Sequence, residues 1–125
     1  MASHPASAID FFADDGVLEM PYVAQIGMSP VYRGHDEIRG LFAKLAETIP
    51  TWRFRDVEIH MATDDKVFAE FHVDEPTVRP GRRFTQHFFA LMVVRDGKIT
   101  RLRETLDLVA SARAFLPNGV HDIPA

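Results

Sequence analysis

The sequence predicts an α+β fold in which helices cover the concave side of a curved antiparallel sheet and enclose an apolar pocket. Three observations support this fold class. Apolar residues recur at helical spacing over residues 35–49, four β-type segments fill residues 52–106, and two turn sequences join those segments into a meander. Helices gathered on one face of an antiparallel sheet are a common α+β arrangement. A sheet of long consecutive strands coils, so its concave side must be filled by side chains, a helix or a ligand.

The first thirty residues predict a short helix and a short strand. Residues 5–12 suit a helix, with Ser3 as its N-cap, and Asp14-Asp15-Gly16 follows as a break. Residues 17–22 alternate as a strand does, and Pro21 favours a position at a sheet edge. Residues 23–31, which contain glycine and proline, are expected to form a loop.

Residues 35–49 predict the clearest helix. Asp36 and Glu37 lie in its first turn, where negative charge is favourable, and Pro50 stops it. One face of this helix carries the apolar stripe Ile38, Leu41, Phe42, Leu45 and Ile49.

The remaining residues are mostly β-type. Asp96-Gly97 supplies the positive φ angles of a tight hairpin turn, and residues 75–81 make a looser one. Asp107 can cap a last short helix that runs to Phe115. Enrichment in β-branched and aromatic residues predicts four strands, over residues 52–61, 67–74, 83–94 and 99–106.

Length and composition narrow the class of protein. A chain of 125 residues with 46% apolar and 26% charged residues fits one globular domain, here residues 1–125. The sequence has no cysteine, which removes disulfides, thiolate nucleophiles and cysteine-based zinc sites. A net charge of -4 argues against nucleic-acid binding. The longest apolar run and the N-terminal sequence suit neither a membrane span nor a signal peptide, so we expect a cytoplasmic protein.

Strand parity singles out Glu104 as the candidate catalytic residue. It alternates in phase with Leu102 and Leu106, so the three side chains share the buried face of their strand. A carboxyl group among apolar neighbours is costly to ionise, which raises its pKa and suits it to general acid or base work. The alternatives are a structural acid bonded to a core donor, or an acid paired with an arginine.

The same parity predicts the wall of the pocket. Gln86 could bind a ligand carbonyl or Glu104, or it could equally be an ordinary amide at the edge of the core. The other expected wall residues are apolar or aromatic, and in a hollow barrel such residues can be core and ligand contact at once. They are Met20, Tyr22, Trp52, Phe54, Phe71, Phe88, Met92 and Leu102.

The convex face of the sheet predicts a homodimer. Phe68, Phe89, Leu91 and Val93 would form an apolar patch that no predicted helix is left to cover, and such patches usually mark subunit contacts. In the alternative, residues 109–123 fold over this face and leave a monomer. Charged and polar side chains of both signs would surround the patch, namely Glu70, His72, His87, Arg101 and Arg103.

We expect no metal and no organic cofactor. Glu70, His72 and His87 share the convex face but do not follow a known metal-ligand spacing, so a solvent or dimer contact is the favoured interpretation. His35 is expected at the surface, and the sequence does not place His60. The sequence has no glycine-rich phosphate loop.

Three motifs resemble the SnoaL-like proteins of the nuclear transport factor 2-like superfamily. Residues 12–21 read FADDGVLEMP, residues 32–42 read YRGHDEIRGLF, and Arg95-Asp96-Gly97-Lys98-Ile99 is followed by Arg103-Glu104 and Asp107. The resemblance covers residues 8–116 and implies a cone-shaped α+β barrel with a deep pocket. The family's first long helix has no counterpart here, which implies an open pocket, a pocket closed by a partner subunit, or a start further upstream.

The resemblance also bears on the reaction. SnoaL-like polyketide cyclases carry an acidic acid/base residue at the position of Glu104, and the phenazine-biosynthesis A/B proteins have a glutamate there. Ketosteroid isomerases place carboxylates at the positions of Met20 and Ala90, and limonene-epoxide hydrolases use polar residues near Phe71 and Val73, so neither constellation is intact.

Two functions remain open at this point. In the first, Glu104 moves a proton on a small apolar carbonyl or aromatic molecule and promotes cyclisation, isomerisation or condensation without a cofactor. In the second, the same fold binds a hydrophobic ligand or dimerises without turnover.

Overall fold

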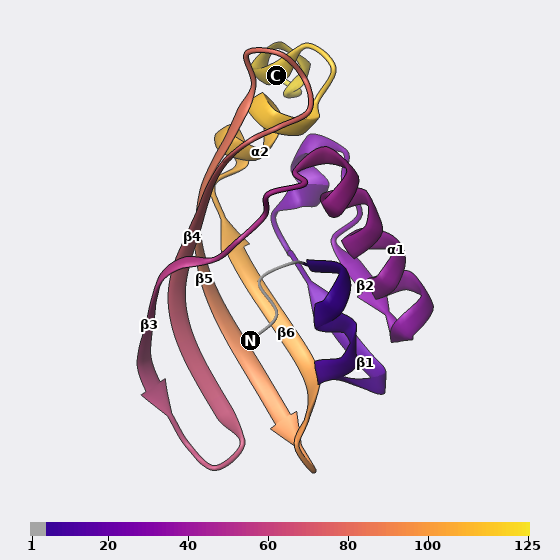
Figure 1. The fold of residues 1–125 in the computed structure, drawn as a ribbon, viewed down its shortest axis with the longest axis vertical. Helices are drawn as coiled ribbons and strands as arrows, with labels where there is room; N and C mark the ends of the chain where they lie inside the picture. The colour runs from indigo at the N-terminus through magenta and orange to yellow at the C-terminus, as the bar shows by residue number, and fades with distance from the viewer. Residues whose placement is uncertain (1–4) are drawn as a thin grey trace.

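A computed structural model describes residues 5–125 as one curved sheet with helices on its concave side (Figure 1). The predicted α+β class is therefore confirmed, whereas the predicted N-cap Ser3 lies outside the described residues. The helices are η1 (Pro5–Phe11), η2 (Val23–Ile26), α1 (Gly34–Thr48), α2 (Leu108–Phe115) and η3 (Gly119–Asp122). The strands are β1 (Phe12–Glu19), β2 (Val31–Arg33), β3 (Arg55–Ala62), β4 (Lys66–Pro76), β5 (Arg83–Arg95) and β6 (Lys98–Leu106).

The six strands lie in the order β2-β1-β6-β5-β4-β3. Strands β3 to β6 form the antiparallel meander that the turn sequences predict. Asp96 and Gly97 adopt positive φ angles of 52° and 76° in the tight turn between β5 and β6. The sheet is mixed rather than wholly antiparallel, because β1 pairs in parallel with β6, far from it in the sequence.

The first strand begins earlier than residues 17–22 suggested. Asp14-Asp15-Gly16 does not end a helix; it forms an irregularity inside β1, where the register with β6 shifts between Phe12 and Val17. A Cβ atom at Gly16 would lie 3.0 Å from the carbonyl oxygens of Ala13 and Ile99, so the close approach of these backbones requires glycine.

Two other boundaries differ from the prediction. The expected loop over residues 23–31 contains the short helix η2 and ends in strand β2, which pairs with β1. The strand expected over residues 52–61 begins only at Arg55, so Trp52 precedes β3. Both differences arise because pairing with a neighbouring strand, which one sequence window cannot show, sets where a strand begins.

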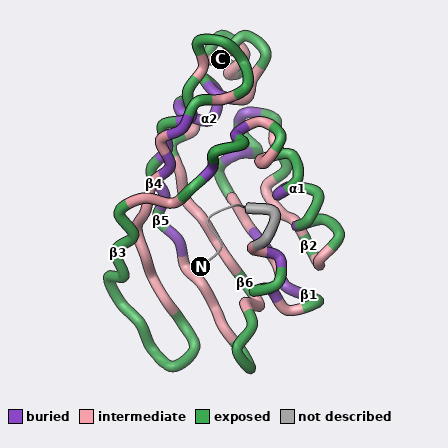
Figure 2. Tube along the Cα trace, viewed as in Figure 1, coloured by how far each residue is buried: buried purple, intermediate pink, exposed green. Residues whose placement is uncertain are grey.

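Helix α1 anchors one of two core clusters. Its stripe buries Ile38, Leu41 and Phe42 against Phe12 and Leu18 of β1, together with Ile9 of η1. Leu45, one turn further along, packs against this cluster and against the next one. Figure 2 shows buried segments on both sides of the space between α1 and the sheet.

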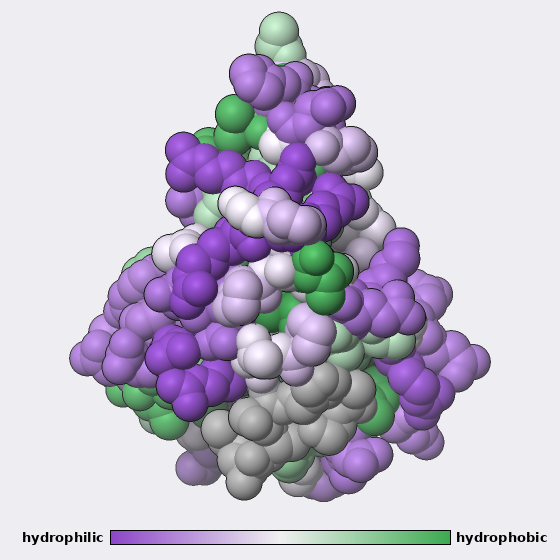
Figure 3. Space-filling view, turned by 45° about the horizontal axis from the view of Figure 1, so that its top comes forward, coloured by the Kyte–Doolittle hydropathy of each residue, from purple (hydrophilic) through white to green (hydrophobic). Residues whose placement is uncertain are grey.

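The second cluster fills the end of the sheet where α2 lies. It joins Ile49 at the end of α1 and Ala114 of α2 to strand residues of β4 and β5, among them Phe84 and Phe88. The sheet is thus closed at this end by both helices (Figure 1). No helix among residues 5–125 is both long enough and apolar enough to cross a membrane. In Figure 3 the visible surface is largely hydrophilic, with small separate apolar areas.

Candidate functional site

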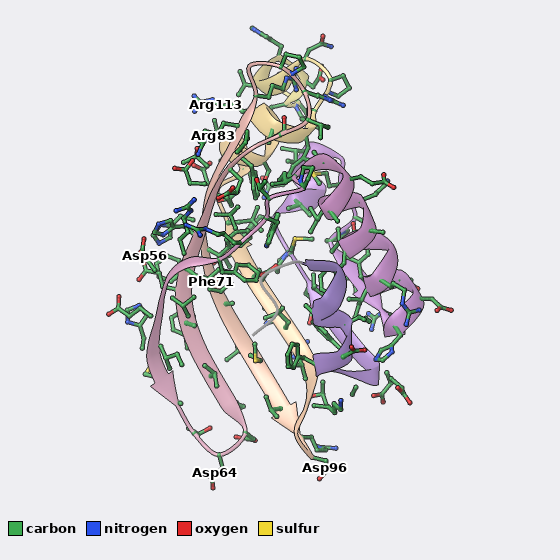
Figure 4. All side chains as sticks on the ribbon, in the orientation of Figure 1. Asp56, Asp64, Phe71, Arg83, Asp96 and Arg113 are labelled. Carbon is green, nitrogen blue, oxygen red and sulfur yellow. The ribbon has the colours of Figure 1, made fainter. Side chains whose placement is uncertain are left out.

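The strand registers place the predicted site residues on the concave face. Glu104 of β6 lies directly opposite Ala90 of β5, and the next pairs on this face are Met92 with Leu102 and Phe88 with Leu106. On the other side of β5, Phe88 lies opposite Phe71. Figure 4 shows Phe71 between the sheet and α1, whereas Asp56 points away from that space. The parity prediction for this face therefore agrees with the register.

Glu104 has an apolar surrounding. Burial raises the pKa of its carboxyl group from the usual 4.5 to about 7. The residue as a whole is half-buried. No described residue forms an ion pair with it. With a pKa of about 7, the carboxyl group of Glu104 is protonated in about half of the molecules at pH 7.

The two arginines beside Glu104 in the sequence lie on the opposite face. Arg101 Nε donates to Glu19 Oε1 at 2.5 Å, and Arg103 donates to Glu19 Oε2 at 3.3 Å. Although burial of Glu19 acts to raise its pKa, the hydrogen bonds and charges of the two arginines hold it below the usual value. Glu104 therefore does not pair with Arg101 or Arg103, because both guanidinium groups are bound to Glu19.

Aromatic rings form the wall on the β3 side of the concave face. Phe71 stacks on Phe88 with 5.1 Å between ring centroids, and Phe54 meets Phe71 edge-on at 5.0 Å. Trp52 contacts Phe54 edge-on at 5.8 Å and lies 6.4 Å from Phe88. Its buried Nε1 donor has no hydrogen-bond partner among the described residues. These four rings form an aromatic wall whose one polar side-chain atom, Trp52 Nε1, makes no hydrogen bond to the described residues.

Gln86 is a structural amide. Its Nε2 donates to the carbonyl oxygen of Asp107 at 2.7 Å and to Ser111 Oγ at 3.1 Å. Its Oε1 accepts from the backbone N–H groups of His87 and Asp107 at 2.9 and 2.8 Å. Because both donors and both acceptor positions are used, the prediction of Gln86 as a ligand contact is wrong and its alternative, a core amide, is correct.

The remaining wall residues differ in exposure. Met20 and Leu102 pack against the α1 core cluster, and Met92 is half-buried beside Leu102. Tyr22, in the turn after β1, is 51% exposed, so its place near a pocket mouth stays a prediction.

The concave face is open at the end away from α2. Ile59 of the edge strand β3 lies opposite Ala69 and is 61% exposed, although the register turns it to the concave face. Two surface grooves lie elsewhere. One, of about 660 Å³, runs between the start of β1 and the β5–β6 turn, and the other, of about 460 Å³, is lined by Arg53, Phe54, Arg55 and Asp56. Phe54 thus joins the aromatic wall to the second groove.

Sequence reasoning missed one buried ion pair. Arg55 donates to Glu75 Oε2 at 2.7 Å, and Glu75 is only 7% exposed. The hydrogen bond from Arg55 is the main cause that holds the pKa of Glu75 below its usual value. The prediction placed Glu75 in a loop, but β4 runs on to Pro76, and the parity of the extended strand turns the side chain inward. Only the length of that strand could have revealed the pair.

The convex face combines exposed aromatic rings with histidines. Phe68 stacks on Phe89 at 6.1 Å, and Phe89 is 40% exposed. As predicted, His72 and His87 lie on this face, stacked at 5.7 Å. Helix α2 does not cover it, since Phe115 and Ser111 contact Phe84 and Gln86, whose side chains lie on the other face. In the alternative that left a monomer, residues 109–123 cover the convex face. The part of this segment that lies in α2 does not do so.

Comparison with known proteins agrees with this geometry. An uncharacterized PhzA/B-like protein of Pseudomonas aeruginosa is 32% identical over 96 residues, which are 76% of this chain and 67% of that protein. Among solved structures, a Bacillus subtilis protein described as a candidate isomerase matches with a TM-score of 0.77 at 24% identity, covering 87% of this chain and 78% of its own. A phenazine biosynthesis-related protein of Pseudomonas aeruginosa matches at 0.75 and 22% identity, covering 97% and 77%.

The structural matches fall below 25% identity and therefore establish the fold alone. The family assignment comes from the sequence. The model of the SnoaL-like domain matches residues 2–102. This range includes all of β5, β6 up to Leu102, and all of the convex residues named above except Arg103. The chain belongs to the SnoaL-like domain family.

Proposed function

We propose that the concave face binds a small apolar molecule with a carbonyl or aromatic group and that Glu104 catalyses a proton transfer on it without a cofactor. The observation that carries the proposal is the place of Glu104 on the concave face, opposite Ala90 and between Leu102 and Leu106, where burial raises its pKa to about 7. A carboxyl group that titrates near the working pH is the most effective acid or base at that pH, because both of its forms are populated.

The neighbours of Glu104 support a role in chemistry rather than in binding charge. Ala90 opposite it is small and leaves room above the carboxyl group, and Leu102 and Leu106 flank it on the same strand. In this site a protonated Glu104 donates its proton to a substrate oxygen, and the carboxylate takes a proton from carbon. Cyclisation, isomerisation and condensation each need one or both of these steps.

The aromatic wall supports the choice of substrate. Phe71 and Phe54, which are only partly buried, present apolar ring surface on top of the buried rings of Phe88 and Trp52. Such flat surfaces hold a planar or hydrophobic molecule in few orientations. Restricting a flexible substrate in this way itself lowers the barrier to a ring closure. The similarity to a candidate isomerase and to a phenazine biosynthesis-related protein is consistent with a small-molecule substrate.

The chain carries its own probe for ligand binding. Trp52 is its one tryptophan and belongs to the aromatic wall, so a ligand on the concave face changes its fluorescence. A panel of apolar ketones, quinones and aromatic acids, together with any compound released from the purified protein on denaturation, identifies a binder by this signal. Turnover of that binder is then followed by mass spectrometry.

Glu104→Gln tests the proposal, with Glu47→Gln on the exposed face of α1 as the matched control. We expect Glu104→Gln to keep the fluorescence response and to lower turnover by about 10²–10⁴-fold, the usual contribution of a general acid or base. Equal turnover in both variants would contradict the proposal and leave a binding module of the same fold.

We also propose that two chains pair through the convex face. The exposed ring of Phe89 and its stacking partner Phe68 supply an apolar centre, with Leu91 and Val93 on the same strand face. A twofold axis lets one such patch serve both chains.

A further inference from the structure

Four side chains from three neighbouring strands meet on the convex face, beside Phe68 and Phe89. Glu58 and His60 come from β3, Glu70 from β4 and His87 from β5. His60 Nε2 lies 2.8 Å from Glu70 Oε1, and His87 Nε2 lies 2.5 Å from Glu70 Oε2. Two imidazoles thus converge on the two oxygens of one carboxylate.

Glu58 brings a second carboxylate to the same place. It stands directly opposite Glu70 in the β3–β4 register, and its Oε1 lies 3.9 Å from His60 Nδ1. One ligand atom each from Glu58, His60 and Glu70 lies within 4.8 Å of the other two. A metal ion with bonds of about 2.0–2.2 Å fits among atoms at such separations after small side-chain rotations.

The charges at this place favour a cation. Like charges directly opposite each other on adjacent strands destabilise a sheet. The ion-pair partners that the described residues give Glu58 and Glu70 are histidines, with no lysine or arginine among them. A divalent cation between the two carboxylates balances their charge.

We propose that Glu58, His60 and Glu70 form a binding site for one divalent transition-metal ion, for which zinc is the best match, and that His87 positions Glu70 by holding its second oxygen. An imidazole nitrogen and two carboxylates are ligands that zinc accepts, whereas magnesium and calcium select oxygen alone. Three paired strands hold the backbone of these residues in place, which suits a fixed site. The sequence analysis led to an expectation of no metal, because these ligands come together only in the folded sheet.

The site is separate from the concave pocket. Glu70 lies opposite Phe89 in the β4–β5 register, whereas Glu104 lies opposite Ala90, whose side chain points to the other face. The metal is therefore not a reactant in the proposed proton transfer. In the proposed dimer the site lies at the edge of the patch of Phe68 and Phe89, where an ion fixes the orientation of the polar rim.

The experiment uses the untagged chain, stripped with a chelator, and titrates it with Zn²⁺ alone at pH 7.5 by calorimetry. We expect one Zn²⁺ per chain and a melting temperature that rises with Zn²⁺ concentration, because an ion that binds only the folded chain stabilises it. His60→Ala and Glu70→Gln each weaken binding by at least about tenfold, the smallest loss typical of changes close to a metal. Circular dichroism checks that these surface variants remain folded.

Two histidine variants serve as controls. His121→Ala changes a histidine near the C-terminus, and His72→Ala changes a histidine on the same face that pairs with Asp56 instead of Glu70. Both are expected to bind Zn²⁺ as the parent chain does. The proposal is overturned if Zn²⁺ does not bind, if His60→Ala binds it unchanged, or if His72→Ala abolishes binding. It is also overturned if Mg²⁺ binds as tightly as Zn²⁺, because the two carboxylates would then account for the binding without a histidine.

Discussion

The side chain of Gln86 and the backbone of Asp107 form a two-point contact. Gln86 Oε1 accepts from the N–H of Asp107 at 2.8 Å, and Gln86 Nε2 donates to its C=O at 2.7 Å. This contact joins the first part of β5 to the point where β6 ends and α2 begins. It lies in a buried position, since Gln86 is only 1% exposed.

The first prediction concerns this contact. Gln86→Leu should lower the free energy of unfolding by about 3 kcal/mol, because it removes four hydrogen bonds and leaves partly buried backbone groups of Asp107 and His87 without this partner. Urea denaturation measures the change. Gln25→Leu, the same substitution at an exposed position, should change the stability by less than about 0.5 kcal/mol. Equal stability of the two variants would show that the contact contributes nothing.

The second prediction concerns the cap of α2. The side chain of Asp107 accepts from the backbone N–H groups of Val109 and Ala110 at 2.9 and 3.2 Å. Asp107→Ala should cost about 1 kcal/mol of unfolding free energy, the usual value of a lost N-cap, whereas Asp107→Asn keeps an acceptor and most of the stability. Thermal unfolding measures both variants. Equal losses of stability in Asp107→Ala and Asp107→Asn would mean that the negative charge of Asp107, and not its hydrogen bonds, stabilises α2.

The third prediction concerns pH. Burial raises the pKa of Glu104 from 4.5 to about 7, so the folded chain resists the ionisation that the unfolded chain undergoes freely. The folded state is therefore favoured fully below pH 4.5, and this advantage is lost as the pH rises through 7. The loss amounts to about 3 kcal/mol, at 1.36 kcal/mol per pKa unit.

Comparison with Glu104→Gln isolates that loss, because glutamine does not titrate. From pH 4 to pH 8 the unfolding free energy of the parent chain should fall by about 3 kcal/mol relative to that of the variant. Urea denaturation across this range measures it. A difference that stays constant with pH would mean that Glu104 has an ordinary pKa, and would remove the basis of the proposed proton transfer.

The fourth prediction concerns assembly. Phe89→Asp places a charge at the centre of the proposed dimer patch, so we expect it to convert a dimer into a monomer in sedimentation at micromolar concentration. Val109→Asp is the matched control, because Val109 on α2 is 41% exposed and Phe89 is 40% exposed. A parent chain that sediments as one species near 14.1 kDa would refute the dimer.

Much of the fold could be read from local patterns. The apolar stripe of residues 35–49 predicted α1, Asp96-Gly97 predicted the β5–β6 turn, and Asp107 predicted the start of α2. Alternation along β6 placed Glu104 between Leu102 and Leu106. These features succeed because helix and strand periods, turn residues and caps are properties of a few neighbouring residues.

The candidate site was only partly predictable. Alternation turned Gln86 to the correct face but could not show that Asp107 and Ser111 use its whole amide. The break expected at Gly16 is an irregularity within β1, because the glycine is required by a distant carbonyl of β6. Such outcomes depend on which backbone lies opposite, and that is decided by strand pairing.

Neighbouring residues were sufficient to predict the fold class, the faces of the long strands and the apolar surroundings of Glu104, because each follows from a local pattern. The parallel pairing of β1 with β6, the ion pair of Arg55 with Glu75, and the convergence of His60 and His87 on Glu70 arise in the folded chain alone. These contacts join residues 10 or more positions apart. Their formation depends on the register and curvature of the whole sheet, which no single segment encodes.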